Sequence, residues 1–186
     1  MGGSSTRMGA DKALIDVGGQ TMGLRALRAL SGAGAQRCAA IGGDRSWATE
    51  LDIEYVPDDM PGEGPLAAIS TALRWAASHS EIVVITACDH PGIRSSDLSS
   101  LITALTMDPN SYISQAKSET GVIQPFPSAW RTILNDEVRL LVLGGERRAQ
   151  KGRIAKVVEV ELSPETLVDV DTPEDLDQWN GLQTPK

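Results

Sequence analysis

Short runs of β-branched and apolar residues alternate along this chain with segments of helical periodicity. The clearest run is 82–87 (IVVITA), whose continuous apolar character is typical of a strand covered on both faces. The clearest helical pattern is 96–107, where leucine and isoleucine recur at i, i+3, i+4 and i+7. Strands that alternate with helices indicate βαβ units, so we expect an α/β fold with a mostly parallel sheet.

The remaining elements continue this alternation, with no internal repeat and no interdomain linker in the sequence. A length of 186 residues suits one domain of ordinary size. We therefore expect a single domain over residues 1–186, with a sheet between two helical layers. Further strands are expected at 37–41, 53–56, 112–115, 122–126 and 157–162, and further helices at 22–30, 65–79, 130–134 and from Thr172 onward.

Charge and cysteine content narrow the class of protein. The formal net charge is −8, and the resulting field repels nucleic acid and anionic membrane surfaces. No apolar run approaches the roughly 20 residues of a membrane-spanning helix, and the sequence begins without the apolar segment of a signal peptide. Cys38 and Cys88 are too few for a disulfide framework or a four-ligand zinc site. We expect a cytoplasmic protein with reduced, buried thiols and no nucleic-acid or membrane partner.

The most informative stretch for function is the start of the chain, GGSSTRMGADK after Met1. Small residues let a backbone approach a ligand closely, so the N–H groups around Gly2, Gly3 and Ser5 can converge on phosphate oxygens. Arg7 and Lys12 add positive charge to an otherwise acidic chain. The pattern is neither a Walker A loop nor a dinucleotide-binding G-x-G-x-x-G. Its composition equally permits a flexible N-terminal tail.

A phosphate-binding loop of this kind normally follows a β-strand, which fixes the direction of the loop. Only Met1 precedes the first glycine here. Two interpretations follow: the first strand of the sheet is missing from this sequence, or the loop is not held rigidly.

Five later segments follow the opening loop in order: PD at 57–58, GPLA at 64–67, CDHP at 88–91, GERR at 145–148 and VDVDTPEDL at 168–176. Together with the opening loop they resemble the molybdenum cofactor guanylyltransferases, a family of nucleotidyltransferases. The opening loop is similar to their signature loop, and the later segments to their D…GPLAG, C-D-x-P, G-E-R-R and N-x-N-T-P-E-D/E-L motifs. The sequence departs from the family at 169 and 171, where aspartates replace asparagines, and at Ala68, where glycine is common.

The resemblance implies a Rossmann-like nucleotidyltransferase that transfers GMP from GTP to the molybdopterin cofactor and releases pyrophosphate. GTP and molybdopterin would be its substrates, and molybdoenzymes or cofactor-delivery proteins its candidate protein partners. One alternative keeps the chemistry but changes the nucleotide or the phosphorylated acceptor. Another is a weakly active or inactive nucleotide-binding paralogue, which the missing strand and the altered amides suggest.

The resemblance also assigns the catalytic residues. Nucleotidyl transfer needs position and counter-charge rather than a covalent step. Lys12 would contact the α-phosphate, and Arg7 the β- and γ-phosphates. Asp89 follows the buried run 82–87, at the strand end where ligands bind in open α/β sheets. A carboxylate beside phosphates requires a cation between them, so Asp89 is expected to hold Mg²⁺. His90 is interpreted as structural.

Further residues are expected around the substrates. Asp58 matches a family position that contacts the nucleotide, and Asp44 follows another strand and could face the base. Asp169 and Asp171 are expected to point to opposite sides of the chain, one toward the metal or the acceptor and the other structural. A basic loop could hold the phosphate of the acceptor, although a solvated run of charge is the usual explanation. The loop residues assigned to the acceptor are Arg147 and Arg148.

Overall fold

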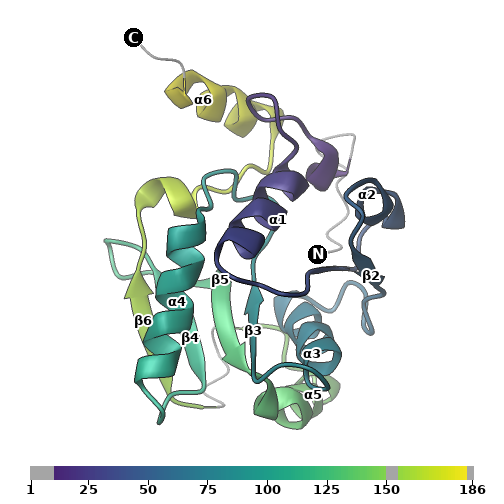
Figure 1. The fold of residues 1–186 in the computed structure, drawn as a ribbon, viewed down its shortest axis with the longest axis vertical. Helices are drawn as coiled ribbons and strands as arrows, with labels where there is room; N and C mark the ends of the chain where they lie inside the picture. The colour runs from purple at the N-terminus through teal and green to yellow at the C-terminus, as the bar shows by residue number, and fades with distance from the viewer. Residues whose placement is uncertain (1–10, 150–154, 184–186) are drawn as a thin grey trace.

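The structure is a computed structural model, and it describes residues 11–149 and 155–183. The expected loop residues Gly2, Gly3, Ser5 and Arg7 lie outside the described residues. Figure 1 shows helices and strands alternating through the described chain. In chain order the elements are η1 (Lys12–Leu14), α1 (Met22–Gly32), β1 (Ala39–Ile41), α2 (Arg45–Glu50), β2 (Glu54–Val56), α3 (Pro65–Ala76), β3 (Ile82–Ile85), α4 (Ser95–Met107), β4 (Ile113–Lys117), β5 (Ile123–Arg131), η2 (Thr132–Leu134), α5 (Asn135–Leu143), β6 (Val157–Glu161), η3 (Pro164–Leu167) and α6 (Pro173–Gln183).

The strands form a mixed arrangement, so the expectation of a mostly parallel sheet is wrong. One sheet has the order β3-β5-β4-β6, in which β5 runs antiparallel to both neighbours and β6 runs parallel to β4. A second sheet contains β1 and β2 in parallel. The physical reason is the short connection from β4 to β5, residues 118–122, because a parallel crossover needs a dozen or more residues.

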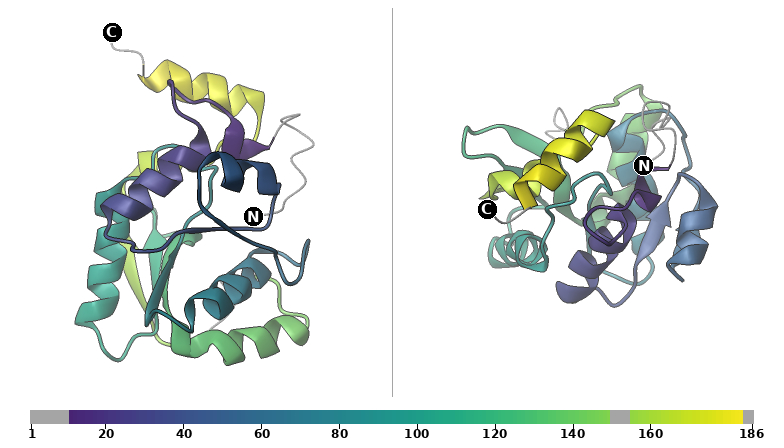
Figure 2. Two further views of the ribbon diagram at one scale, coloured as in Figure 1. Left: turned by 45° about the vertical axis from the view of Figure 1, so that its right-hand side comes forward. Right: turned by 90° about the horizontal axis from the view of Figure 1, so that it is seen from above.

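Side-chain alternation along the strands divides the core into two layers. On one face of the larger sheet, Val83 and Trp130 pack with buried residues of α3 and α5. On the other face, Val84 and Ala129 pack with buried residues of α1 and α4. Successive strand residues point to opposite faces, so these neighbouring pairs place helices on both sides of the sheet. The result is a helix–sheet–helix arrangement, seen in two further orientations in Figure 2.

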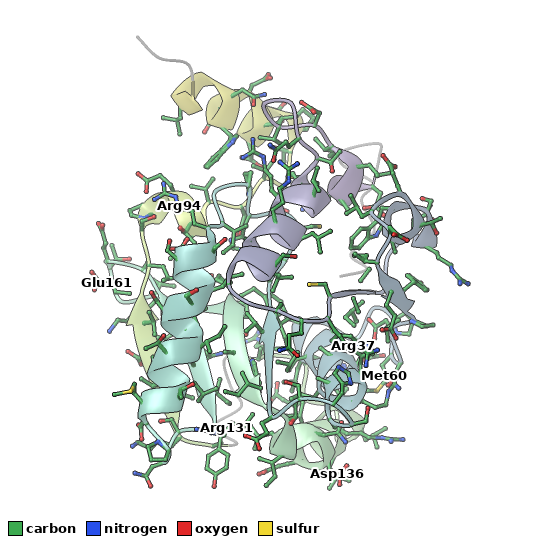
Figure 3. All side chains as sticks on the ribbon, in the orientation of Figure 1. Arg37, Met60, Arg94, Arg131, Asp136 and Glu161 are labelled. Atoms are coloured by element: carbon green, nitrogen blue, oxygen red, sulfur yellow. The ribbon has the colours of Figure 1, made fainter. Side chains whose placement is uncertain are left out.

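The expected helix at 130–134 begins too early. Trp130 belongs to β5, where it pairs with Val83 on one side and Ile113 on the other, and its side chain is fully buried. Two ladders supply its backbone partners, and this outweighs the apolar spacing that suggested a helix. Arg131, labelled in Figure 3, ends the strand and donates to the carbonyls at Ser111 and Leu105, which ties α4 to the sheet.

A large cavity separates the two sheets. Within the described residues, β1 pairs on one side with β2, and β3 pairs on one side with β5. Residues of both unpaired edges line a mostly apolar space of about 520 Å³, which α1 and α3 also border. Cys38 and Cys88 are free thiols that line this space, but they are partly exposed rather than buried as expected. No helix in the described part of the chain has the length and apolar character to cross a membrane.

Candidate functional site

A small pocket of about 160 Å³ opens where the chain leaves β3 and where the segment before α6 runs alongside it. The two segments are joined by a backbone hydrogen bond, because Val170 N donates to the carbonyl oxygen of Asp89 at 2.9 Å. Three carboxylates and one histidine therefore face a common space. The lining residues are Pro65, Ala87, Asp89, His90, Gln124, Pro125, Phe126, Asp169 and Asp171.

Lys12 connects this pocket to the start of the described chain. Its Nζ lies 3.2 Å from Asp89 Oδ2 and also contacts Asp171 Oδ1. Burial lowers the pKa of Lys12, but the hydrogen bond to Asp171 and the charge of Asp89 outweigh it, so the pKa is raised above its ordinary value. The ammonium group is therefore charged at neutral pH. The structure brings together Lys12 and Asp89, two residues that the sequence analysis assigned to one site.

His90 lies at the back of the pocket and is 6% exposed. Its Nε2 is 3.0 Å from Asp169 Oδ1 and 3.9 Å from Asp89 Oδ1, and its Nδ1 is 3.2 Å from the carbonyl oxygen of Thr166. Burial lowers the pKa of His90, but the hydrogen bond and charge of Asp169, with the charge of Asp89, raise it overall. Sequence reasoning did not place His90 among the site residues. Its position directly after Asp89 was the one available indication.

Asp169 and Asp171 both border the pocket, so the expectation that they point to opposite sides is wrong. Residues two apart in an extended segment share a face, and the residue between them points the other way. Val170 is that residue, fully buried in a cluster with Met22 and Trp179. Burial of Val170 thus turns both carboxylates outward, one to His90 and one to Lys12.

The start of α6 holds this segment in place. Thr172 Oγ1 accepts from Asp175 N at 3.2 Å, and Asp175 Oδ2 accepts from the backbone N–H groups of Thr172 and Asp171 at 2.8 and 3.0 Å. This reciprocal capping box confirms the expected helix start. The bond to Asp171 N also fixes the backbone that carries one of the carboxylates.

The predicted nucleotide contacts Asp44 and Asp58 do not line the pocket. Asp44 caps α2 by accepting from Ser46 N at 2.8 Å, and its own N–H lies 3.3 Å from Asp11 Oδ2. The end of β1 is therefore linked to the residue that precedes Lys12. Asp58 accepts from Thr71 Oγ1 and from the backbone beside it, which stabilises the turn ahead of α3.

The predicted acceptor-binding arginines do not line the pocket either. Arg147 pairs with Glu63 and donates to the carbonyl oxygens of Val142 and Glu146. Its own carbonyl accepts from Leu66 N at 3.3 Å, so one of the N–H groups at the start of α3 is already occupied. Arg148 is exposed.

The pocket has the chemistry to hold a divalent cation and a phosphate together. Ligand atoms of Asp89, His90 and Asp169 lie within 4.8 Å of one another. Carboxylate oxygens suit Mg²⁺ and Mn²⁺, while an imidazole nitrogen adds affinity for divalent cations of the first transition row. Lys12 provides a compact positive charge at the edge of the same cluster.

The fold and this site define an α/β protein of the nucleotidyltransferase class. Molybdopterin-guanine dinucleotide biosynthesis protein A from Archaeoglobus fulgidus has the same fold, with a TM-score of 0.76, 21% identity and coverage of 97% of this chain and 94% of that chain. A protein from Mycobacterium tuberculosis H37Rv, solved in complex with manganese, is similar in fold with a TM-score of 0.66, 16% identity and 91% coverage of both chains.

The chain belongs to the MobA-like NTP transferase domain family, whose model matches residues 1–159. It is also 31% identical to the molybdenum cofactor guanylyltransferase of Rhizobium meliloti (strain 1021), over 95% of this chain and 86% of that protein. The family resemblance drawn from the sequence motifs is confirmed.

Proposed function

We propose that this protein transfers GMP from GTP to the molybdopterin cofactor and releases pyrophosphate. Family membership supports the reaction class, and near-full-length similarity to a molybdenum cofactor guanylyltransferase supports the substrates. The observation that carries the proposal is the contact of Lys12 with both Asp89 and Asp171 at one pocket. Residues 1–186 would act as one nucleotidyltransferase domain, and the product would pass to a molybdoenzyme or a cofactor-delivery protein.

The reaction is an in-line displacement at the α-phosphorus of GTP. A phosphate oxygen of molybdopterin forms the new bond to this phosphorus, while the bond to the bridging oxygen of the β-phosphate breaks. Pyrophosphate leaves with the electron pair of that bond. The protein's task is to fix the two reactants and to balance negative charge that builds up on the transferring group.

Lys12 supplies the positive charge from the protein. An ammonium group has three N–H donors, and within the described residues two of them meet Asp89 and Asp171. The third can donate to an oxygen of the α-phosphate without breaking either contact. The two carboxylates thus hold Lys12 in position, and its raised pKa keeps it protonated through the reaction.

Asp89 and Asp169 would hold Mg²⁺ through their carboxylate oxygens. When bound, the cation would neutralise charge on the phosphate oxygens of GTP. The N-terminal loop would contact the phosphates of GTP through Gly2, Gly3, Ser5 and Arg7. Asp44 remains a proposed base contact and Asp58 a proposed nucleotide contact. The proposed acceptor contacts are Arg147, Arg148, Asp169 and Asp171.

The test is pyrophosphate release from GTP in the presence of molybdopterin and Mg²⁺. We expect release with GTP and much slower release with CTP. Asp89→Asn should lower the turnover number about 100-fold, because it removes charge from the cation site. Asp59→Asn is the matched control, since Asp59 is exposed and pairs with Arg74 outside the pocket. Equal turnover in the Asp89 variant and the wild type would contradict the proposal.

A further inference from the structure

The hydrogen-bond requirements of His90 are unusual for a buried histidine. The carbonyl oxygen of Thr166, 3.2 Å from Nδ1, can only accept, so the ring hydrogen of a neutral His90 belongs on Nδ1. Nε2 then presents a lone pair to the carboxylate of Asp169 at 3.0 Å and to that of Asp89 at 3.9 Å. Three electron-rich atoms facing one another need a positive species between them, which is a second ring proton on Nε2 in the metal-free protein and a metal cation when one is bound.

The imidazole ring is held in this orientation by hydrogen bonds around Thr166. The Thr166 hydroxyl donates to Asp97 Oδ2 at 2.8 Å, and the same oxygen caps α4 by accepting from Arg94 N at 3.0 Å. Arg94 is labelled in Figure 3 beside this corner of the molecule. Metal-binding histidines commonly donate their second ring N–H to a backbone carbonyl or a carboxylate, which fixes the ring. The Nδ1 contact of His90 has this form.

We propose that His90 Nε2 is a metal ligand together with Asp89 and Asp169, and that this nitrogen makes the pocket selective for Mn²⁺ over Mg²⁺. The three ligand atoms come within 4.8 Å of one another and line one pocket. The inference deepens the proposed function, because it names the cation preference of the same site.

The selectivity follows from the ligand set. Mg²⁺ is a hard cation that keeps several waters and binds carboxylates and phosphates, with little gain from an imidazole. Imidazole nitrogen adds affinity for divalent cations of the first transition row, and Mn²⁺ is the member of that row that also shares the carboxylate and water ligands of Mg²⁺. A buried histidine at 6% exposure offers its nitrogen without the competition of bulk water. A site with two carboxylates and one imidazole therefore favours Mn²⁺.

The direct test measures Mn²⁺ binding to the full chain without nucleotide. Binding is monitored as the loss of the free Mn²⁺ signal in electron paramagnetic resonance. Mg²⁺ is then added as competitor. For the wild type we expect one bound Mn²⁺ that is displaced only by about a 100-fold or larger excess of Mg²⁺. Electron spin-echo modulation of the bound ion should show ¹⁴N coupling from a directly coordinated imidazole.

Two variants show which histidine supplies the nitrogen bound to the metal. The chain has two histidines, and His79 is exposed, with its ring against Trp75. His90→Gln should weaken Mn²⁺ binding at least about tenfold, abolish the ¹⁴N coupling and leave Mg²⁺ binding nearly unchanged. His79→Gln should behave like the wild type in all three measurements. The wild-type spectrum alone decides the ligand if the His90 variant does not fold.

The outcomes separate this inference from the proposed function. Bound Mn²⁺ without ¹⁴N coupling, no Mn²⁺ binding by the wild type, or an unchanged Mn²⁺ to Mg²⁺ preference in His90→Gln would each overturn the role of His90. GMP transfer supported by Mg²⁺ would survive any of these results. Conversely, ¹⁴N coupling in a protein that transfers no GMP would support the metal ligand and refute the reaction.

Discussion

At the scale of single residues, the site is organised around the ammonium group of Lys12, which contacts the carboxylates of Asp89 and Asp171. Lys12 and Asp89 are 77 residues apart in sequence, yet the Nζ and Oδ2 atoms lie 3.2 Å apart. Their location in one site was predicted because each follows a recognisable sequence pattern, a glycine-rich loop before Lys12 and the β-branched run 82–87 before Asp89. His90 was not, because its role depends on Thr166 and Asp169, which only the tertiary fold brings to it.

Lys12→Gln tests the residue that balances charge during transfer. We predict that turnover with GTP falls about 100-fold, because the neutral amide gives the α-phosphate no positive charge. The thermal midpoint should also fall, since Asp89 and Asp171 then face each other without the ammonium group. Lys117→Gln is the matched control, because Lys117 pairs with Glu159 at 3.1 Å on an exposed part of the sheet. Turnover within twofold of the wild type would contradict the role given to Lys12.

At the scale of elements, the start of a helix was easier to predict from the sequence than the pairing of the strands. The start of α6 was predictable because its capping residues are three positions apart. The strand partners were not, because pairing is decided by which edges meet in the folded chain. The short link at 118–122 was the exception, since its length alone excludes a parallel crossover between β4 and β5.

Gly92 lets the loop after β3 pack closely against η3. A Cβ at this position would lie 2.1 Å from the carbonyl oxygen of Glu165 and 2.8 Å from the ring of Trp179. Gly92→Ala should therefore destabilise the protein by about 1–3 kcal/mol or more, because backbone must shift. The midpoint of urea unfolding measures this. Gly181→Ala, where a Cβ meets nothing within 4 Å, should be neutral or slightly stabilising. Equal midpoints for the two variants would refute this packing.

From the contacts of Asp108, which follows α4, we predict that the stability of the protein depends on pH. The Ser111 hydroxyl at 2.8 Å and the Lys156 ammonium at 3.0 Å lower the pKa of the Asp108 carboxyl. A lowered pKa contributes stability above the unfolded value of about 3.9, and this is lost as the pH falls through the native value. The urea midpoint of the wild type should therefore exceed that of Asp108→Asn at pH 7, with the difference shrinking below about pH 4. A constant difference across this range would contradict the assignment.

At the scale of the whole molecule, the two sheets face each other across an apolar space of about 520 Å³. The sequence predicted the α/β class and both helical layers from periodicity. It could not predict the strand order β3-β5-β4-β6, because strand order depends on contacts distant in sequence. Among residues 11–149 and 155–183, no strand pairs with the edges of β1 and β3 that border the cavity, and one more extended strand could meet both.

Adding a strand tests that interpretation of the cavity. We predict that an extension of six to eight Val/Ile-rich residues ahead of Met1 raises the thermal midpoint by roughly 5 °C or more, because several apolar side chains become buried. The measurement is a thermal melt of the extended and original chains. An extension of equal length made of glycine and serine is the control. A Val/Ile-rich extension that leaves the midpoint unchanged would mean that the cavity does not accept a strand.

We propose that the pocket bordered by Lys12, Asp89, Asp169 and Asp171 binds the triphosphate and its cation together. The most direct measurement is a crystal structure with a non-hydrolysable GTP analogue and Mn²⁺, using anomalous scattering to locate the metal. We expect an anomalous peak at coordinating distance from Asp89, with the α-phosphate beside Lys12 Nζ. A triphosphate bound elsewhere, with no metal at Asp89, would contradict it.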